Sequence, residues 1–396
     1  MIYFILISLV AALSFLLDKL LKNNSYISSK KRHFLKIILC LSIIALPVLF
    51  AGMRSTEIGA DTSGYALNDF EKSLSAESFF DVVADSNEEP GFIFITYIVA
   101  KLTGNFQLLL GMIELIMMVF ILRFAIDRKD QIPIWLSVSA YMLLCFSESL
   151  TLMRQGISFA ILIYSLKYID AKKYLRLAFF FVIACLFHFS AIFFLAFYAI
   201  YWLYTSCRKQ YMQKIRRIVL VTVAICICAF FIPIIVNQLV DMGFISERYL
   251  LYFNSDRFLN TEIEIGVGLI FRFVWIILFF IAFIMSRNNK KIRICIVGII
   301  SALIVGLGIY IVSMQYIIMS RAATYFEYVA ILIGMGYIWS LMIANKKNSA
   351  KKFFALLLVG AYAMLIFNFT VNTIVNNEKF MVYPYRTVID ETMEWR

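Results

Sequence analysis

Residues 30–65 read KKRHFLKIILCLSIIALPVLFAGMRSTEIGADTSGY, and this stretch indicates the class of protein. A basic cluster, Lys30 to Arg32, stands before an apolar run at 34–52, and polar residues with glycines follow from 53 onward. Crossing a hydrocarbon core of about 30 Å takes about 20 helical residues, so the run predicts a transmembrane helix. The positive-inside rule puts the basic end in the cytoplasm and the glycine-rich end outside.

The same alternation of apolar runs and basic clusters continues along the whole chain of 396 residues. The chain is 62% apolar, its mean hydropathy is +0.85, and 16% of its residues are charged, against about 25% in a typical soluble domain. Because helices satisfy their own backbone hydrogen bonds in lipid, this composition predicts an all-α polytopic protein with a single domain over 1–396. We expect about twelve crossings with both termini outside, at 2–21, 34–52, 105–126, 132–148, 155–170, 174–188, 190–206, 217–240, 267–286, 292–313, 317–343 and 353–374.

Three other segments complete the predicted topology. Residues 91–103 are apolar but short, so we expect a re-entrant or interfacial half-helix there. Acidic residues gather at about 53–90 and 241–266, which we expect to be the two larger outward loops. No basic segment precedes the first apolar run and no small-residue cleavage pattern follows it, so 2–21 is expected to be a retained helix and not a signal peptide.

The net charge of +12 does not indicate a nucleic-acid partner, because the lysines and arginines gather in the short clusters that mark cytoplasmic loops. The seven cysteines lie in apolar runs or, for Cys207, beside a basic cluster. This pattern predicts neither a disulfide framework nor a zinc site. The outward segments also lack an Asp-x-Asp pattern, so we expect no metal and no other cofactor.

Four arginines stand outside the cytoplasmic clusters, at the outer ends of helices. An arginine near hydrocarbon costs about 2.5 to 3.5 kcal/mol on insertion scales, so its side chain usually faces a cavity or a partner. Several such arginines together predict an anion-binding site, whereas each one alone is compatible with an interfacial anchor or a nearby carboxylate. The four are Arg54, Arg154, Arg272 and Arg321.

Two of these arginines have an informative context. Arg154 begins a predicted helix, where the amides of the first turn add positive field. Arg321, Tyr325 and Tyr328 are spaced to share one helical face. His188 falls at an outer hairpin, where it is either a hydrogen-bonded structural residue or a phosphate ligand or proton carrier.

Two outward carboxylates are candidate general bases. Asp61 lies in the glycine-rich stretch, which is either an ordinary turn or a loop whose glycines admit a bulky ligand close to the backbone. Glu89 precedes Pro90 and Gly91, where it either begins a helix or contacts a sugar hydroxyl. Glu114 and Glu327 lie within apolar helices and are expected to have partners there.

Several short motifs follow one another from about Gly52 to Tyr385. They are Arg54 with Ile58-Gly59-Ala60-Asp61-Thr62 and Tyr65, Glu89-Pro90-Gly91-Phe92, Arg154-Gln155, His188-Phe189-Ser190-Ala191, Arg321 with Tyr325-Phe326, and Tyr383-Pro384-Tyr385. In this order they resemble the EpsG family of Wzy-like polysaccharide polymerases. That family usually has Gly-Thr-Asp-Thr where this chain has Gly-Ala-Asp-Thr, which keeps the acid and lacks one hydroxyl.

The resemblance implies a GT-C-like helical bundle in the bacterial plasma membrane with an extracytoplasmic active site. It implies an inverting, metal-independent glycosyltransferase that moves a growing glycan from undecaprenyl diphosphate to the non-reducing-end hydroxyl of a lipid-linked repeat unit, giving O-antigen, capsule or exopolysaccharide. A flippase and a chain-length regulator are expected partners. The four arginines are then expected to bind diphosphate, because guanidinium forks match it.

Further roles follow from the same resemblance. Asp61 is expected to be the base, with Glu89 as the second candidate and His188 as either base or diphosphate ligand. Four tyrosines are expected to stack on sugars or bind phosphate, although tyrosines are also ordinary residues of a bilayer interface. They are Tyr65, Tyr325, Tyr383 and Tyr385.

Two other functions stay open on the sequence alone. An O-antigen ligase or another lipid-linked glycosyltransferase shares the donor chemistry, and only the motif order favours a polymerase. A flippase or transporter is less favoured, because it needs charged residues deep in several helices, whereas the unusual charges here gather at one side.

Overall fold

The computed structural model describes residues 1–22, 28–86, 88–205, 210–242, 266–316, 319–375 and 377–390. Within these ranges every regular element is a helix, and the isolated β-bridge pairs Arg54 with Thr387. The predicted all-α fold is therefore confirmed. The chain divides into two compact units, unit 1 (Met1–Tyr168, Lys173–Ala191 and Tyr362–Arg396) and unit 2 (Ile169–Lys172 and Ile192–Ala361). The single domain over 1–396 stays a prediction.

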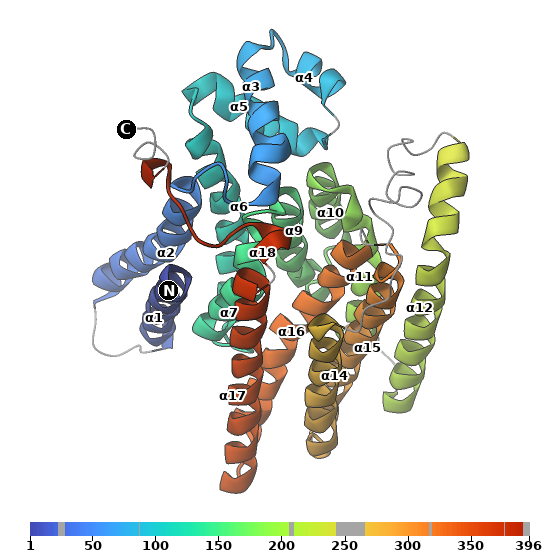
Figure 1. Cartoon of the computed structure of the whole chain (residues 1–396). Coiled ribbons are helices and arrows are strands. Elements are labelled where there is room, and N and C mark those ends of the chain that lie inside the picture. Colours follow the sequence, from blue (N-terminus) through green and yellow to red (C-terminus); the bar gives the residue numbers. More distant parts are fainter. Residues whose placement is uncertain are drawn as a thin grey trace. The chain divides into compact units, whose positions relative to one another are not determined.

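Eight helices in the described ranges are long and apolar enough to cross a membrane (Figure 1). They are α1 (Ile2–Lys22), α2 (Ser29–Gly52), α6 (Phe106–Asp127), α12 (Tyr211–Asp241), α14 (Val267–Met285), α15 (Lys290–Ser313), α16 (Met319–Ala344) and α17 (Asn348–Thr370). The other expected crossings contain shorter or more polar helices, α7 (Ile134–Tyr141) continued by η2 (Met142–Phe146) and α8 (Ser147–Ser149), α9 (Met153–Asp170), α10 (Tyr174–Phe187), and η3 (Phe189–Phe193) with α11 (Phe194–Thr205). Every expected crossing thus contains a helix, and the chain is a multi-pass membrane protein.

The helices α1, α2, α6 and α7 pack against one another in unit 1. Asp18 of α1 is 4% exposed, and its Oδ2 accepts a hydrogen bond of 3.1 Å from the backbone nitrogen of Trp135. That nitrogen belongs to the first turn of α7, which has no intrahelical acceptor for it. Asp18 therefore caps α7 from a neighbouring helix.

Replacing Asp18 with alanine is expected to destabilise unit 1 by about 1 kcal/mol, because the first turn of α7 loses its acceptor. Thermal unfolding of the purified protein in detergent measures the effect. Asp18→Asn keeps an acceptor oxygen and should lose less, and Lys19→Ala, at an exposed position of the same helix, should change little. Equal melting temperatures for Asp18→Ala and Lys19→Ala would contradict the capping role.

Residues 53–90, the first of the two predicted outward loops, are helical over much of their length. They contain α3 (Leu67–Ser75) and α4 (Phe79–Asp85). The acidic residues suggested a solvated loop, but each helix also buries an apolar side chain, with Phe70 and Val82 each 2% exposed. In this segment the spacing of the apolar residues, and not the number of charged residues, therefore indicates the secondary structure.

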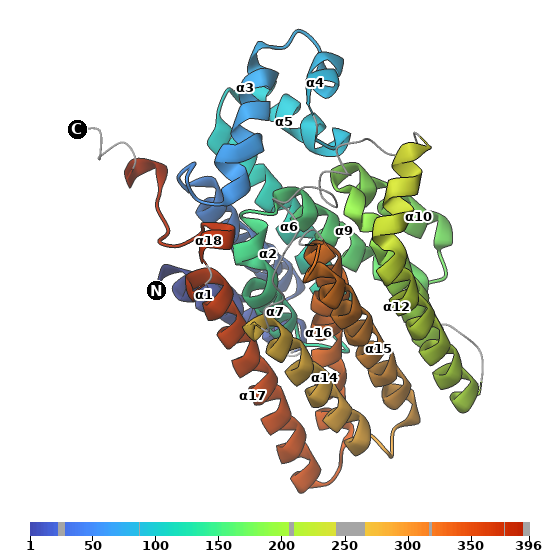
Figure 2. The ribbon, with the colours of Figure 1, turned by 45° about the vertical axis from the view of Figure 1, so that its right-hand side comes forward.

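The short apolar segment after α4 forms α5 (Pro90–Thr103), which packs against α3, α4, α6 and α10 in unit 1 (Figure 2). Lys101 near its end donates to the carbonyl oxygens of Leu74 at 2.9 Å and Ala76 at 2.6 Å. These carbonyls lie at the end of α3, where a lysine satisfies acceptors that the helix leaves open. These two hydrogen bonds tie the end of α5 to the end of α3.

The start of α1, the end of α2 and the segment after α17 meet at one end of unit 1. Tyr3 Oη donates to the carbonyl oxygen of Val382 at 2.6 Å. Tyr385 stacks on Phe50 with ring centroids 4.0 Å apart. The beginning of the first helix and the segment after the last long helix therefore lie on the same side, as the predicted topology requires.

In unit 2, α15 packs against α11, α12, α14 and α16. Two glycines make room for aromatic rings there. A Cβ on Gly298 would lie 1.9 Å from the ring of Tyr204, and one on Gly334 would lie 2.3 Å from the ring of Phe279. The second outward loop, predicted at 241–266, falls almost entirely on 243–265, outside the described residues.

Candidate functional site

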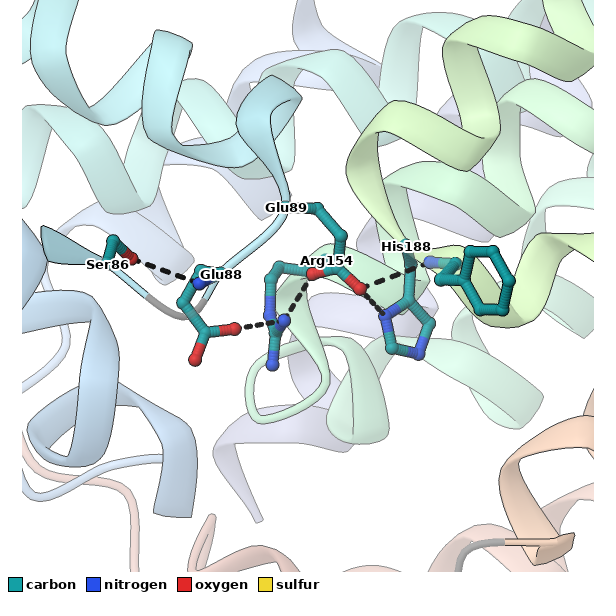
Figure 3. A network of polar contacts seen from close by, with 6 residues as sticks. Ser86, Glu88, Glu89, Arg154 and His188 are labelled. Carbon is teal, nitrogen blue, oxygen red and sulfur yellow. Dashed lines mark hydrogen bonds and ion pairs between the residues drawn. The ribbon is translucent and has the colours of Figure 1, made fainter. Parts of the chain in front are cut away.

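Side chains from three helix ends of unit 1 form a cluster of polar contacts (Figure 3). Glu88 and Glu89 directly precede α5, and Arg154 is the second residue of α9. His188 follows the last residue of α10. The structure thus brings together three of the predicted site residues, Glu89, Arg154 and His188, from segments far apart in the sequence.

Glu89 lies at the centre of this cluster and is 8% exposed. Its Oε1 accepts a hydrogen bond of 3.1 Å from the backbone nitrogen of Phe189 and lies 3.1 Å from Nδ1 of His188. Its Oε2 accepts a hydrogen bond from Nη1 of Arg154. Both carboxylate oxygens are therefore engaged.

These contacts set the charge state of Glu89. Burial alone raises the pKa of its carboxyl group, but the hydrogen bond with His188, the charge of Arg154 and the Phe189 amide together bring that pKa well below its usual range. Glu89 is thus an ionised, weakly basic carboxylate. Because a carboxylate only accepts, Nδ1 of His188 carries a hydrogen in this contact.

Arg154 connects the two glutamates and an aromatic ring. Its Nη1 forms ion pairs with Oε2 of Glu88 and with Oε2 of Glu89. Its guanidinium carbon lies 4.3 Å from the ring centroid of Tyr65 in η1 (Thr62–Ala66), within the range of a cation–π interaction. Its Nε is buried and has no hydrogen-bond partner among the described residues.

A close approach of two helices places Glu89 beside His188. A Cβ on Gly91, in the first turn of α5, would lie 2.7 Å from the carbonyl oxygen of Leu186 and 2.9 Å from its carbonyl carbon. Both atoms belong to the backbone of α10, so they cannot move aside as a flexible side chain would. Gly91 therefore allows the separation of α5 and α10 that the Glu89–His188 contact needs.

Gly91→Ala is expected to push α5 from α10 and to lower the activity of the site roughly 10-fold to 100-fold through misplacement of Glu89 and His188. Product formed per unit of membrane-inserted protein measures the effect. Gly64→Ala is the matched control, because a Cβ on Gly64 meets nothing within 4 Å. Equal activity of the two variants would show that the close approach is dispensable.

Four other predicted residues of unit 1 are Asp61, Tyr65, Tyr383 and Tyr385. Asp61 is half-buried directly before η1. Burial chiefly, and the nearby charge of Asp61, raise the pKa of Tyr65, while Arg154 lowers it. Tyr383 is 41% exposed, and Oη of Tyr385 donates to the carbonyl oxygen of Phe50 at 2.5 Å.

One glycine of the glycine-rich stretch, Gly59, is required by a close contact within the protein itself. Gly59 has a φ of +91°, and a Cβ there would lie 2.5 Å from the carbonyl oxygen of Leu150 and 2.8 Å from Oγ1 of Thr62. Its nitrogen donates to the carbonyl oxygen of Met381 at 2.8 Å. The backbone at Gly59 thus approaches the protein's own backbone, which explains this glycine without a ligand.

The remaining predicted residues belong to unit 2. Nε of Arg272 lies 2.5 Å from Oε1 of Glu327, its Nη1 donates to the carbonyl oxygen of Gly268 at 2.8 Å, and its guanidinium carbon lies 3.4 Å from the ring centroid of Tyr310. The expected partner of Glu327 is therefore Arg272. Two further predicted residues lie in α16, where Arg321 is half-buried and Tyr325 is 0% exposed.

Sequence reasoning did not single out Asp69 of α3, which is 4% exposed and has an Oδ2 without a hydrogen-bond partner in the described part of the chain. Burial raises the pKa of its carboxyl group, and a hydrogen bond from Ser86 lowers it. The Oγ of Ser86 also accepts from the backbone nitrogen of Glu88 at 3.0 Å. Only the fold of 53–90, which sequence reasoning treated as a loop, connects Asp69 with the cluster.

No group of three or more histidine, cysteine, aspartate or glutamate side chains is placed to hold a metal ion among the residues the structure describes. The charged side chains of the cluster are one arginine and two glutamates, and His188 lies beside one of these glutamates. Such an arrangement holds a proton acceptor beside a cation that suits an anionic group.

Comparison with known proteins identifies the family. No curated protein and no solved structure matches the chain. The EpsG family matches residues 37–387, which covers most of the chain and includes every residue of the cluster. The chain therefore belongs to the EpsG family of Wzy-like polysaccharide polymerases.

Proposed function

We propose that this polysaccharide polymerase joins lipid-linked repeat units at the outer face of the bacterial plasma membrane. The donor is a growing glycan on undecaprenyl diphosphate, and the acceptor is the non-reducing-end hydroxyl of a second lipid-linked unit. The observation that carries the proposal is the contact of Glu89 with both Arg154 and His188, which places a cation suited to diphosphate beside a candidate proton acceptor.

The proposed reaction is a single displacement at the anomeric carbon. The acceptor oxygen bonds to that carbon, the bond from the carbon to the diphosphate oxygen breaks, and the acceptor proton passes to Nε2 of His188. Undecaprenyl diphosphate leaves with the electron pair, so the configuration at the anomeric carbon inverts. Glu89 holds His188 in the tautomer that leaves Nε2 free of hydrogen.

Among the candidate bases, the geometry favours His188 over Glu89. A base with a strongly lowered pKa takes up a proton poorly, and both oxygens of Glu89 already accept hydrogen bonds. Glu89 is therefore proposed to orient His188, and Asp61 remains the alternative base.

Arg154 is proposed to stabilise the leaving diphosphate. Negative charge grows on that group as the glycosidic bond breaks, and a fixed guanidinium in a partly buried site interacts with it strongly. The side chains of Arg154 and Glu88 are 13% and 16% exposed, so Glu88 is accessible enough to be displaced from Nη1 when a diphosphate binds. The buried Nε offers a second donor.

The direct test uses purified protein in liposomes with undecaprenyl-diphosphate-linked repeat units. A ladder of lipid-linked polymer with release of undecaprenyl diphosphate is the expected product, with inverted configuration at each new linkage. Glu89→Ala should lose the ladder. Arg386→Ala should keep it, because Arg386 is exposed and its ion pair with Glu57 at 3.4 Å lies at the surface.

Other products would assign other functions. Transfer of a finished glycan to a non-repeat acceptor, with no ladder, identifies a ligase. Movement of repeat units across the bilayer with no new glycosidic bond identifies a transporter, and either result overturns the proposal.

A further inference from the structure

Residues 377–388, which we call the C-terminal strap, follow the last long helix of unit 1. They contain α18 (Asn377–Phe380) and a stretch without helix over 381–387 (Figure 1). Oδ1 of Asn377 accepts from the backbone nitrogens of Val382 and Tyr383, each at 2.8 Å, and its Nδ2 donates to the carbonyl oxygen of Tyr383. The side chain of Asn377 thus fixes the turn with which the strap begins.

One contact of the strap reaches the connection that precedes Arg154. Oγ1 of Thr151 donates to the carbonyl oxygen of Phe380 at 2.5 Å, and Thr151 is 2% exposed. Shortly before the strap, Oγ1 of Thr373 donates to Oγ of Ser147 at 2.9 Å, at the start of α8. The connection from α8 to α9, which leads to Arg154, is therefore held by the C-terminal part of the chain.

Other contacts of the strap reach the stretch that leads to Tyr65. The backbone nitrogen of Gly59 donates to the carbonyl oxygen of Met381 at 2.8 Å, and that of Ser55 donates to the carbonyl oxygen of Arg386 at 2.9 Å. Gly59 shortly precedes η1, which carries Tyr65. The strap therefore holds this second segment by backbone hydrogen bonds.

Arg54, which the sequence presents as a diphosphate ligand, joins the same two segments inside unit 1. It is 2% exposed, and its backbone pairs with Thr387 of the strap. Its Nη2 donates at 3.3 Å to Oγ1 of Thr62, the first residue of η1, and at 3.3 Å to Sδ of Met153, the residue before Arg154. The strap and Arg54 thus connect the same two segments.

The cation–π contact between Arg154 and Tyr65 depends on these attachments, because its two partners come from segments far apart in the sequence. Misplacing a group by about 1 Å can lower a reaction rate about 10²-fold. We infer that the C-terminal strap positions Arg154 against Tyr65, and that Thr151 is the positioning residue through which the strap acts on Arg154. The effect on the reaction rests on the proposed function, whereas the attachment of the strap to the two segments does not.

The attachment is tested by hydrogen–deuterium exchange of the purified protein in detergent. Thr151→Val keeps the shape of the side chain and removes the hydroxyl, so the carbonyl oxygen of Phe380 loses this donor. The amide of Gly59, which is bonded to the neighbouring Met381, should then exchange roughly 10-fold faster, because the strap opens more often. Unchanged exchange at Gly59 would overturn the inference.

Two further variants serve as controls for this measurement. Thr151→Ser keeps the hydroxyl and should keep the exchange of the wild-type protein. Thr222→Val removes a hydroxyl that is also buried but donates within its own helix, to the carbonyl oxygen of Ile218 at 2.7 Å. It should leave the exchange at Gly59 unchanged.

The positioning role is tested by steady-state kinetics with lipid-diphosphate-linked repeats. Thr151→Val should lower kcat roughly 10-fold to 100-fold with little change in KM, because Arg154 is proposed to act on the leaving group in the transition state. Thr151→Ser should restore most of the activity. Asn377→Ala, which changes the strap without touching the connection before α9, should reproduce both the faster exchange at Gly59 and the lower kcat.

Two other outcomes have distinct meanings. If exchange at Gly59 rises in Thr151→Val and Asn377→Ala while kcat per folded protein stays at the wild-type value, the strap only stabilises unit 1 and the positioning role is overturned. If the wild-type protein forms no polymer at all, the proposed function fails, while the exchange measurement still decides whether the strap holds the two segments.

Discussion

Replacing Arg154 with methionine is expected to abolish polymer formation and to destabilise unit 1. Arg154 is the cation paired with Glu88 and Glu89, and removing one member of a largely buried ion pair costs about 3 to 5 kcal/mol. Loss of the group that stabilises the leaving diphosphate lowers kcat by a further 10²-fold to 10³-fold, in the order of magnitude typical for such donors. Polymer length in reconstituted liposomes and thermal unfolding measure the two effects.

A double variant separates the effect of Arg154 on stability from its effect on the reaction. Arg154→Met combined with Glu88→Gln removes one of the two carboxylates left unbalanced, so the melting temperature should rise partway towards that of the wild-type protein. Polymer formation should remain absent, because nothing replaces the guanidinium at the diphosphate. If polymer formation returns together with stability, Arg154 serves only to hold the two glutamates.

The fold class could be predicted from the sequence because each transmembrane helix is indicated by its own residues and does not depend on contacts with distant parts of the chain. Apolar runs of bilayer length and basic clusters between them identify helices one at a time, and each expected crossing contains one. The helices within the outward segment 53–90 were not predicted, because a count of carboxylates ignores the burial of Phe70 and Val82.

The site was predicted in part. Glu89, Arg154 and His188 were named from their chemistry, but their mutual contact depends on how close α5 comes to α10, which a single glycine at 91 permits. Asp69 carried no signal, because its burial follows from tertiary packing of α3. Arg54 and Arg154 look alike in sequence, and only their burial and partners distinguish them.

Arg54 and Arg154 are two arginines of the same unit, and they differ in burial and in the groups that they contact. Arg54 is 2% exposed, and its Nη2 donates to neutral groups. Arg154 is more exposed and has its carboxylates in direct contact. A ligand can exchange with Glu88 at Arg154, whereas no exchange is accessible at Arg54.

Replacing His188 with glutamine is expected to lower kcat by about 10²-fold to 10⁴-fold, because the acceptor hydroxyl loses its proton acceptor. His33→Gln is the matched control, since His33 is exposed and is the other of the two histidines in the chain. Wild-type activity should fall on acidification through the range in which histidines take up a proton, about pH 5 to 8, because a protonated imidazole cannot accept. His188→Gln should lose this dependence.

Protonation of Glu89 cannot itself cause this fall of activity on acidification, which is the acid limb of the pH profile. Its pKa is lowered well below the usual range of a glutamate, so it stays ionised throughout the interval in which the activity changes. Its stabilising effect is present above the pKa of an unfolded glutamate and is lost only as the pH falls towards the lowered value. Glu89→Gln is therefore expected to act through His188, since loss of the carboxylate makes the imidazole harder to protonate and moves the acid limb to lower pH.

The two variants together decide which group takes the proton. A limb that disappears in His188→Gln and shifts in Glu89→Gln assigns the proton to Nε2 of His188, with Glu89 as the residue that orients it. A limb that persists unchanged in His188→Gln places the acceptor elsewhere. Asp61 beside η1 and Asp69, whose pKa is raised by burial, are then the carboxylates to replace next.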